Sequence, residues 1–221
     1  MSFKTEYHYT DRETKARYVW LKYQPILRGR RILDVGADEC YLKEHLDEEA
    51  SYWGIGLGGH PDQQVNLEFG EIPFPDNSFD TVLCLDVLEH LEHIHQVFDE
   101  LCRVARHYVV ISLPNPLGLI YHRLCFGDYT PGRFTKFYGL PLEPPKDRHR
   151  WFFSYEEAEK FILYRAALNG MRLLQMETEG MGGEPSWWRR LARMILLRND
   201  LDLRNLHAGP LWAVLEKTTN G

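Results

Sequence analysis

The sequence predicts an α/β protein with a doubly wound, mainly parallel sheet and helices on both faces. Short apolar runs of strand length alternate along the chain with longer segments of helical periodicity, as in βαβ units. The run Thr81 to Leu85 is apolar throughout rather than at every second residue, which indicates a strand buried on both faces. Another strand, Ile32 to Val35, ends at Gly36, and open α/β sheets bind ligands beyond the carboxyl ends of their strands.

Length and composition narrow the class of molecule. The 221 residues are enough for one sizeable core, so we expect a single domain over residues 1–221. A net charge of −6 disfavours nucleic acid as a general partner. Four cysteines without a Cys-x-x-Cys pair favour buried thiols over disulfides or zinc. No signal peptide or transmembrane segment is evident, so we expect a cytoplasmic protein. The sequence does not indicate the oligomeric state.

An N-terminal helix is expected within residues 8–27. Thr10 and Glu13 have the spacing of a capping box, in which two side chains satisfy the first backbone N–H groups of a helix. Pro25 is expected to mark the end of this helix, because proline has no N–H group to donate. The helix precedes the first strand of the sheet.

Strands and helices then alternate. The glycine turn is expected to lead into a helix that ends near residue 48, and Asp86 to Arg106 carries apolar residues at helical spacing. Ser154 and Glu157 form a capping box for a helix that ends near Asn169. The remaining strands are expected at residues 51–57, 81–85, 108–113, 171–178 and 211–217.

Two segments depart from this alternation. The insertion at 114–150 mixes aromatic and cationic residues without clear periodicity. It is expected to form a lid over an anionic or ring-bearing substrate, or else a small core at the edge of the sheet. The segment 185–198 is predicted to form a basic amphipathic helix with Trp188 and Leu191 on its apolar side. It is a candidate for peripheral membrane contact, although packing against the protein is the favoured interpretation.

The segments around the strand at 81–85 have the pattern of a known family. Ile72-Pro-Phe-Pro-Asp-Asn-Ser-Phe-Asp80 precedes it, and Val82-Leu-Cys-Leu-Asp-Val-Leu-Glu-His90 runs through it. With the turn at Gly36, they resemble the class I S-adenosylmethionine (SAM)-dependent methyltransferases. The resemblance implies a Rossmann-like methyltransferase fold with a seven-stranded sheet and SAM as cofactor. It also implies methyl transfer to an oxygen or nitrogen of a small-molecule, glycan-like or nucleotide acceptor.

The resemblance also implies positions for the cofactor. Gly36 and Ala37 would lie under its amino-acid part, Glu68 beside its adenine, and Leu85 on its methionine side. Asp34, at the end of its strand, would orient the turn or accept a cationic group of the ligand. The candidate cofactor-binding residues are Asp34, Gly36, Ala37, Asp38, Gly56, Leu57, Glu68, Phe69 and Leu85.

Three positions depart from the family pattern. The family usually has glycine where this chain has Asp38, and often again at Cys40. Gly56 replaces the acidic residue that holds the ribose, and the loss of such a charged hydrogen bond costs roughly 1.5–3 kcal/mol. The alternative function is therefore a catalytically degenerate methyltransferase-fold binding protein.

The run Gly54-Ile-Gly-Leu-Gly-Gly59 also matches a dinucleotide fingerprint. It is followed by His60-Pro61 rather than by an apolar helix, so a phosphate would find no helix N-terminus there. A loop at the edge of the cofactor site is the favoured interpretation, and NAD is not expected.

His90 and His149 are the candidate catalytic residues. Asp86, Glu89 and His90 occupy one predicted helix end. With His149 they resemble the metal-binding quartet of small-RNA 2′-O-methyltransferases, which implies a divalent ion and an RNA acceptor as a further alternative. We favour the metal-free interpretation, because Leu-Glu-His after the fourth strand is widespread in metal-free relatives.

Overall fold

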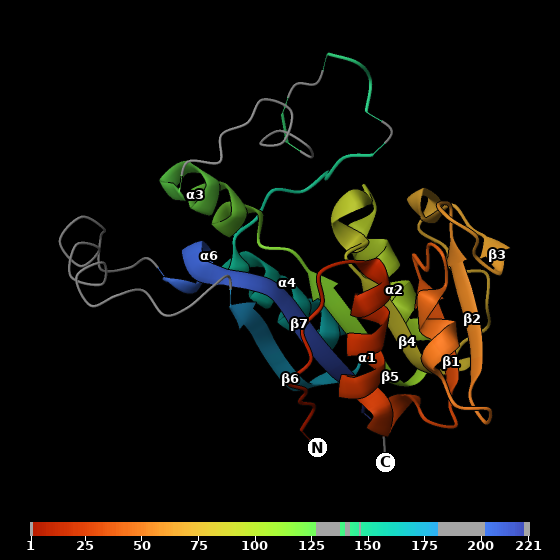
Figure 1. Cartoon of the computed structure of the whole chain (residues 1–221). Helices are drawn as coiled ribbons and strands as arrows, with labels where there is room; N and C mark the ends of the chain where they lie inside the picture. Colours follow the sequence, from red (N-terminus) through yellow and green to blue (C-terminus); the bar gives the residue numbers. More distant parts are fainter. Residues whose placement is uncertain (1, 127–137, 140–141, 146, 181–201, 219–221) are drawn as a thin grey trace.

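The computed structural model describes residues 2–126, 138–139, 142–145, 147–180 and 202–218, which contain one seven-stranded sheet (Figure 1). The strands lie in the order β3-β2-β1-β4-β5-β7-β6, and β7 runs antiparallel to both of its neighbours. The strands are β1 (Arg31–Val35), β2 (Ser51–Gly56), β3 (Gln63–Gln64), β4 (Phe79–Leu85), β5 (Ala105–Leu113), β6 (Met171–Gly180) and β7 (Ala208–Lys217). The predicted fold class, a doubly wound and mainly parallel sheet of seven strands, is confirmed.

Helices cover both faces of the sheet, with α1 on one face and α2 and α4 on the other (Figure 1). The α-helices are α1 (Arg12–Leu27), α2 (Ile94–Val104), α3 (Pro116–Phe126), α4 (Tyr155–Leu168) and α6 (Arg204–His207). Three short 3₁₀ helices are η1 (Tyr41–His45), η2 (Leu67–Phe69) and η3 (Leu88–His90). None of the helices in the described ranges has both the length and the apolar character needed to cross a bilayer.

Successive side chains of the central strands enter two different cores. In β1, Ile32 packs on the side of α1, whereas Leu33 packs on the side of α2 and α4. In β4, Leu83 and Val82 divide in the same way. Because successive side chains of a strand point to opposite faces, both must be apolar in a sheet that is covered on both sides. This requirement explains the unbroken apolar runs of the sequence.

The N-terminal helix differs in detail from the prediction. It begins after Asp11, whose carboxylate accepts a hydrogen bond from Thr14 N at 2.8 Å, while the Thr14 hydroxyl accepts one from Asp11 N at 3.1 Å. The predicted box of Thr10 and Glu13 is therefore wrong by one residue. Pro25 lies inside the helix, which kinks at Tyr23. The kink accommodates the missing N–H group, so Pro25 does not end the helix.

Two predicted helices are shorter than expected, for the same physical reason. The helix predicted up to residue 48 is only the five-residue η1, because Asp38 and Cys40 have left-handed φ values of 52° and 56°. The helix predicted from Asp86 begins at Ile94, after η3, because Asp86 itself has a φ of 56°. A left-handed residue cannot continue a right-handed helix. Both interruptions lie at the carboxyl ends of central strands.

Other elements agree with the prediction or extend it. The Ser154–Glu157 capping box is present, and each predicted strand overlaps an observed one. The insertion contains α3, which its sequence pattern did not predict. The central part of the insertion and the basic helix predicted at 185–198 lie outside the described residues.

Candidate active site

A cavity of about 560 Å³ lies at the carboxyl ends of β1 and β4, beside the first turns of α1. This volume is typical of small-molecule sites. Its lining is acidic, because five side chains carry a carboxyl group and two carry a guanidinium or ammonium group. These are Asp34, Asp38, Asp86, Glu89 and Asp147 against Arg12 and Lys15.

The glycine turn lines one end of this cavity. Gly36 has a φ of +81°, and a Cβ atom there would overlap the Cγ2 atom of Val87. Glycine is therefore required by backbone conformation and by close packing. The N–H groups of Gly36 and Ala37 both donate to Ile55 O, at 2.7 and 3.1 Å. These two donors are therefore used within the protein rather than offered to a ligand.

Asp34 supplies a buried carboxyl group at the same end. It accepts a hydrogen bond of 2.8 Å from the Tyr52 hydroxyl. Burial raises the pKa of Asp34 to about 6, while the Tyr52 hydrogen bond opposes part of that rise. At neutral pH the carboxyl group is therefore mainly ionised although it is buried, which suits a cationic group of a ligand.

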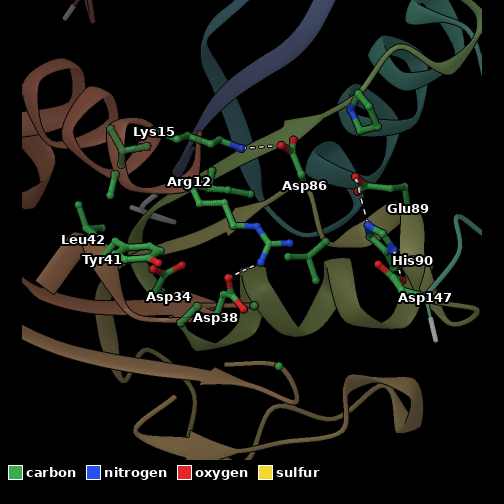
Figure 2. A pocket seen from close by; sticks show the side chains of 18 of the residues that line it. Arg12, Lys15, Asp34, Asp38, Tyr41, Leu42, Asp86, Glu89, His90 and Asp147 are labelled. Atoms are coloured by element: carbon green, nitrogen blue, oxygen red, sulfur yellow. Dashed lines mark hydrogen bonds and ion pairs between the residues drawn. The ribbon is translucent and has the colours of Figure 1, made fainter. Parts of the chain in front are cut away.

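Asp38 faces the cavity and forms an ion pair with Arg12 of α1. In Figure 2, Arg12 lies between two groups of labelled residues. Asp34 and Tyr41 are on one side of it, and Glu89 and His90 are on the other. Cys40 is absent from the lining, and its thiol lies 3.6 Å from His60 O. Neither departure from the family pattern fills the cavity.

The structure brings some candidate cofactor residues to the cavity and leaves others outside its lining. Asp34, Gly36, Ala37, Asp38 and Leu85 line it. Gly56 and Leu57 do not, although Gly58 of the same loop does. Glu68 also lies outside the lining and pairs with Arg150 at 3.3 Å, and the neighbouring Phe69 is 74% exposed. Contact of these four outlying residues with a cofactor stays a prediction.

Asp86 is held by two partners at the centre of the cavity. Lys15 Nζ donates to its carboxylate at 2.6 Å, and Ser112 Oγ donates to it at 2.6 Å. Burial alone would raise the pKa of Asp86, but Lys15 and then Ser112 outweigh burial and lower it. Sequence analysis missed Arg12 and Lys15. Their spacing of three residues on one helix face was the available signal.

The other end of the cavity contains Glu89, His90 and His149. His149 is distant in sequence, but Arg150 N donates to Glu89 O at 2.8 Å, and Trp151 Nε1 donates to Leu91 O at 2.7 Å. These bonds hold the segment of His149 against η3. The Nε2 atoms of both histidines lie 3.9 Å from Glu89 Oε1.

The polar contacts of this cluster are well defined. Asp147 Oδ1 lies 2.6 Å from His90 Nδ1, and the Tyr138 hydroxyl lies 2.6 Å from His149 Nδ1. Glu89 is only 1% exposed, and its Oε2 atom has no hydrogen-bond partner among the described residues. Burial, and next the charge of Asp86, hold the pKa of Glu89 well above its usual range. Sequence analysis anticipated the three clustered residues but not Tyr138 or Asp147 as their partners.

Comparison with known proteins agrees with this architecture. A family model described as a methyltransferase domain matches residues 46–111, and no curated protein sequence matches the chain. A SAM-dependent methyltransferase from Archaeoglobus fulgidus has a TM-score of 0.53 at 18% identity, over 93% of this chain and 95% of the other. A putative one from Listeria monocytogenes has a TM-score of 0.53 at 14% identity, over 92% and 98%.

A third similar structure is that of the [4+2]-cyclase SpnF, with a TM-score of 0.54 at 13% identity, over 98% of this chain and 86% of the other. At such identities these three likenesses concern the fold alone, and a protein named a cyclase can share it. The matched segment belongs to a methyltransferase domain model, and the fold is one that SAM-dependent methyltransferases of known structure share. The predicted resemblance to the class I SAM-dependent methyltransferase family is thereby confirmed.

Proposed function

We propose that this protein is a SAM-dependent methyltransferase that binds SAM in the cavity and methylates an oxygen or nitrogen of a small-molecule or glycan-like acceptor. The observation that carries the proposal is the acidic lining at the carboxyl ends of β1 and β4. Even without Glu89, whose pKa is raised, four carboxyl groups lie there against two basic groups. SAM carries a sulfonium and an ammonium group against one carboxylate. A cavity of excess negative charge is complementary to such a ligand.

The residues of the glycine end fit this cofactor. When bound, SAM supplies a methyl group on a positively charged sulfur. The Asp34 carboxylate is buried and ionised at neutral pH, so it can accept hydrogen bonds from the ligand's ammonium group. Gly36 has no side chain and lets a ligand approach the backbone, and Leu85 and Val87 add apolar surface to the lining.

The same geometry indicates where the acceptor binds, at the end of the cavity opposite the glycine turn, which we call the acceptor end. As the new bond to the methyl carbon forms and the carbon–sulfur bond breaks, an acceptor hydroxyl or amine must lose a proton. Glu89, His90 and His149 line the cavity away from the glycine turn. They are the groups that an acceptor would meet, and alignment of the two reactants between these ends is the main contribution expected of the protein.

Calorimetry of the full chain with SAM and S-adenosylhomocysteine tests the proposal. We expect one molecule bound per chain, with a dissociation constant between about 1 μM and 1 mM, the range usual for enzyme substrates. Asp34→Asn should weaken binding at least about tenfold, since a charged hydrogen bond contributes about 1.5–3 kcal/mol. Asp76→Asn removes an equal charge outside the lining and should leave binding unchanged. No binding by the unmodified chain would refute the proposal.

A degenerate binding protein is the second candidate, and specific contacts favour it. Arg12 reaches across the cavity to Asp38, and Ile55 O occupies the N–H groups of Gly36 and Ala37. Both contacts neutralise groups that could bind a ligand. If this candidate is right, the unmodified chain does not bind SAM, and the double change Asp38→Gly with Gly56→Asp creates binding.

A further inference from the structure

We propose that Glu89, His90 and His149 form a binding site for one divalent transition-metal ion at the acceptor end of the cavity. One potential ligand atom from each residue lies within 4.8 Å of the other two. All three residues line the cavity, so an ion held there would be accessible to a small molecule. The inference deepens the proposed function, and the role given to the ion below rests on that function.

The distances fit a site that contracts slightly around an ion. Both Nε2 atoms lie 3.9 Å from Glu89 Oε1, which is too long for a hydrogen bond. Metal–ligand bonds of about 2.0–2.2 Å place neighbouring ligand atoms roughly 3–3.5 Å apart. Closing the difference needs side-chain movements below about 1 Å, which rotation about existing torsions supplies.

Both imidazoles have a partner at Nδ1, and the Nε2 atom of each lies towards Glu89. Asp147 Oδ1 lies 2.6 Å from His90 Nδ1 and accepts a hydrogen bond from it. In the neutral tautomer that carries its proton on Nδ1, the lone pair lies on Nε2. The Tyr138 hydroxyl, 2.6 Å from His149 Nδ1, can accept in the same way. Metal-binding histidines characteristically donate their second nitrogen to a carboxylate or another oxygen. Both pairs have this arrangement.

An independent observation is the state of Glu89. Its side chain is 1% exposed, and its Oε2 atom has no partner among the described residues. A buried carboxyl oxygen without a hydrogen-bond partner is costly unless a ligand satisfies it, and a bound cation also stabilises the ionised form. The neighbouring acid Asp86 adds negative charge, whereas Lys15 is directed to Asp86 rather than to Glu89 (Figure 2). Within the described residues, no lysine or arginine therefore pairs with Glu89.

The ligand set indicates the class of ion. Asp86, the fourth member of the alternative quartet that the resemblance implied, is occupied by Lys15 and Ser112. Two imidazoles and one carboxylate remain, a set that suits Zn²⁺, Fe²⁺, Co²⁺ or Mn²⁺ better than Mg²⁺ or Ca²⁺, which prefer oxygen ligands. Three protein ligands leave coordination positions open towards the cavity, as in catalytic rather than structural metal sites.

An ion in this position would activate an acceptor hydroxyl. Coordination lowers the pKa of a bound hydroxyl and fixes its orientation. The hydroxyl proton then leaves to water and the new C–O bond forms. The methyl–sulfur bond breaks with its electron pair remaining on sulfur. Because both Nε2 atoms would be coordinated, His90 and His149 would act as ligands rather than as bases.

The test is metal binding by the full chain, prepared without a histidine tag and freed of metal by a chelator. Co²⁺ and Zn²⁺ are titrated by calorimetry, and visible absorption of Co²⁺ reports nitrogen and oxygen coordination. We expect one ion per chain. Glu89→Gln, which keeps the shape of the side chain, and His149→Ala should each weaken binding more than roughly 100-fold, and Asp147→Asn about 10–100-fold, as for outer partners of metal ligands.

Two control variants make the result specific. His93→Ala removes an exposed histidine three residues from His90 and should leave affinity unchanged. Asp86→Asn should retain metal binding, and a loss as large as that of Glu89→Gln would overturn the three-ligand site. Absence of binding, or binding that Glu89→Gln does not affect, would overturn the inference altogether. SAM binding is measured on the same metal-free protein, so failure of the metal site and failure of the proposed function are distinguishable.

Discussion

The two ends of the cavity differ in how the chain compensates their acidic side chains. At the glycine end, Asp38 pairs with Arg12, and Asp34 accepts a hydrogen bond from Tyr52. At the acceptor end, Glu89 is buried with one oxygen unpartnered among the described residues, and two imidazole nitrogens approach it only to 3.9 Å. The charged groups of the glycine end are compensated by the chain itself, whereas Glu89 at the acceptor end lacks such a partner among the described residues.

This difference explains why the two ends support different kinds of inference. A compensated end can exist without its ligand, so its structure says little about how tightly a cofactor binds. A buried carboxyl group with an unpartnered oxygen is destabilising unless something binds there, so its presence points to a ligand. Four predictions test this comparison, in order of decreasing expected effect on the free energy of unfolding.

The largest effect is expected at the glycine turn. Gly36→Ala should lower the free energy of unfolding by roughly 2–5 kcal/mol, because φ is +81° and the new Cβ atom would overlap Val87. Gly29→Ala is the matched control. Its φ is +62° and the nearest atom lies at 3.5 Å, so only backbone strain of about 1–2 kcal/mol is expected. Equal losses in urea unfolding would show that Val87 does not shape the turn.

The second effect concerns pH and Asp34. Its pKa is raised from 3.8 to about 6, so the folded state holds the proton more tightly than the unfolded state does. The stabilisation is fully present below pH 3.8 and is lost as pH rises to about 6. The loss amounts to about 3 kcal/mol. Asp34→Asn should remove this part of the pH dependence. Identical pH profiles for both proteins would contradict the buried, ionising carboxyl group.

The third effect is stabilisation of the folded chain by a metal ion bound at the acceptor end. At a metal concentration about 100 times the dissociation constant, the free energy of unfolding of the natural chain should rise by about 2.7 kcal/mol. Glu89→Gln, with binding weakened more than roughly 100-fold, should show a rise below about 0.4 kcal/mol at that concentration. Thermal unfolding with and without Zn²⁺ measures both. An equal rise in the two proteins would mean that the ion stabilises some other part of the chain.

The smallest effect is expected for the ion pair of Arg12 and Asp38. Arg12 has a side chain that is 76% exposed, so Arg12→Ala should change stability by less than about 0.5 kcal/mol. SAM affinity should increase by no more than about fivefold, because the ligand would no longer displace the pair. Calorimetry measures whether the affinity for SAM rises or falls. Weaker binding would show that Arg12 contacts the ligand rather than excluding it.

The sequence by itself determined most of the fold and part of the site. Apolar runs identified the central strands because both of their faces are buried, as Ile32 and Leu33 illustrate. The turn at Gly36 and the pairing of Glu89 with His90 are short-range patterns, and a local pattern carries such information. Short helices were overpredicted because nothing in the periodicity of the sequence marks the left-handed conformations of Asp38, Cys40 and Asp86.

Only the tertiary structure decided which distant side chains meet. Lys15 reaches Asp86 from a helix 71 residues earlier and occupies a member of the metal quartet that the resemblance offered as an alternative. His149 reaches Glu89 through backbone contacts of its own segment, and Asp147 and Tyr138 orient the imidazoles. The physical reason is that compensation of a buried charge depends on three-dimensional packing, and the sequence lists charges without showing which of them remain uncompensated.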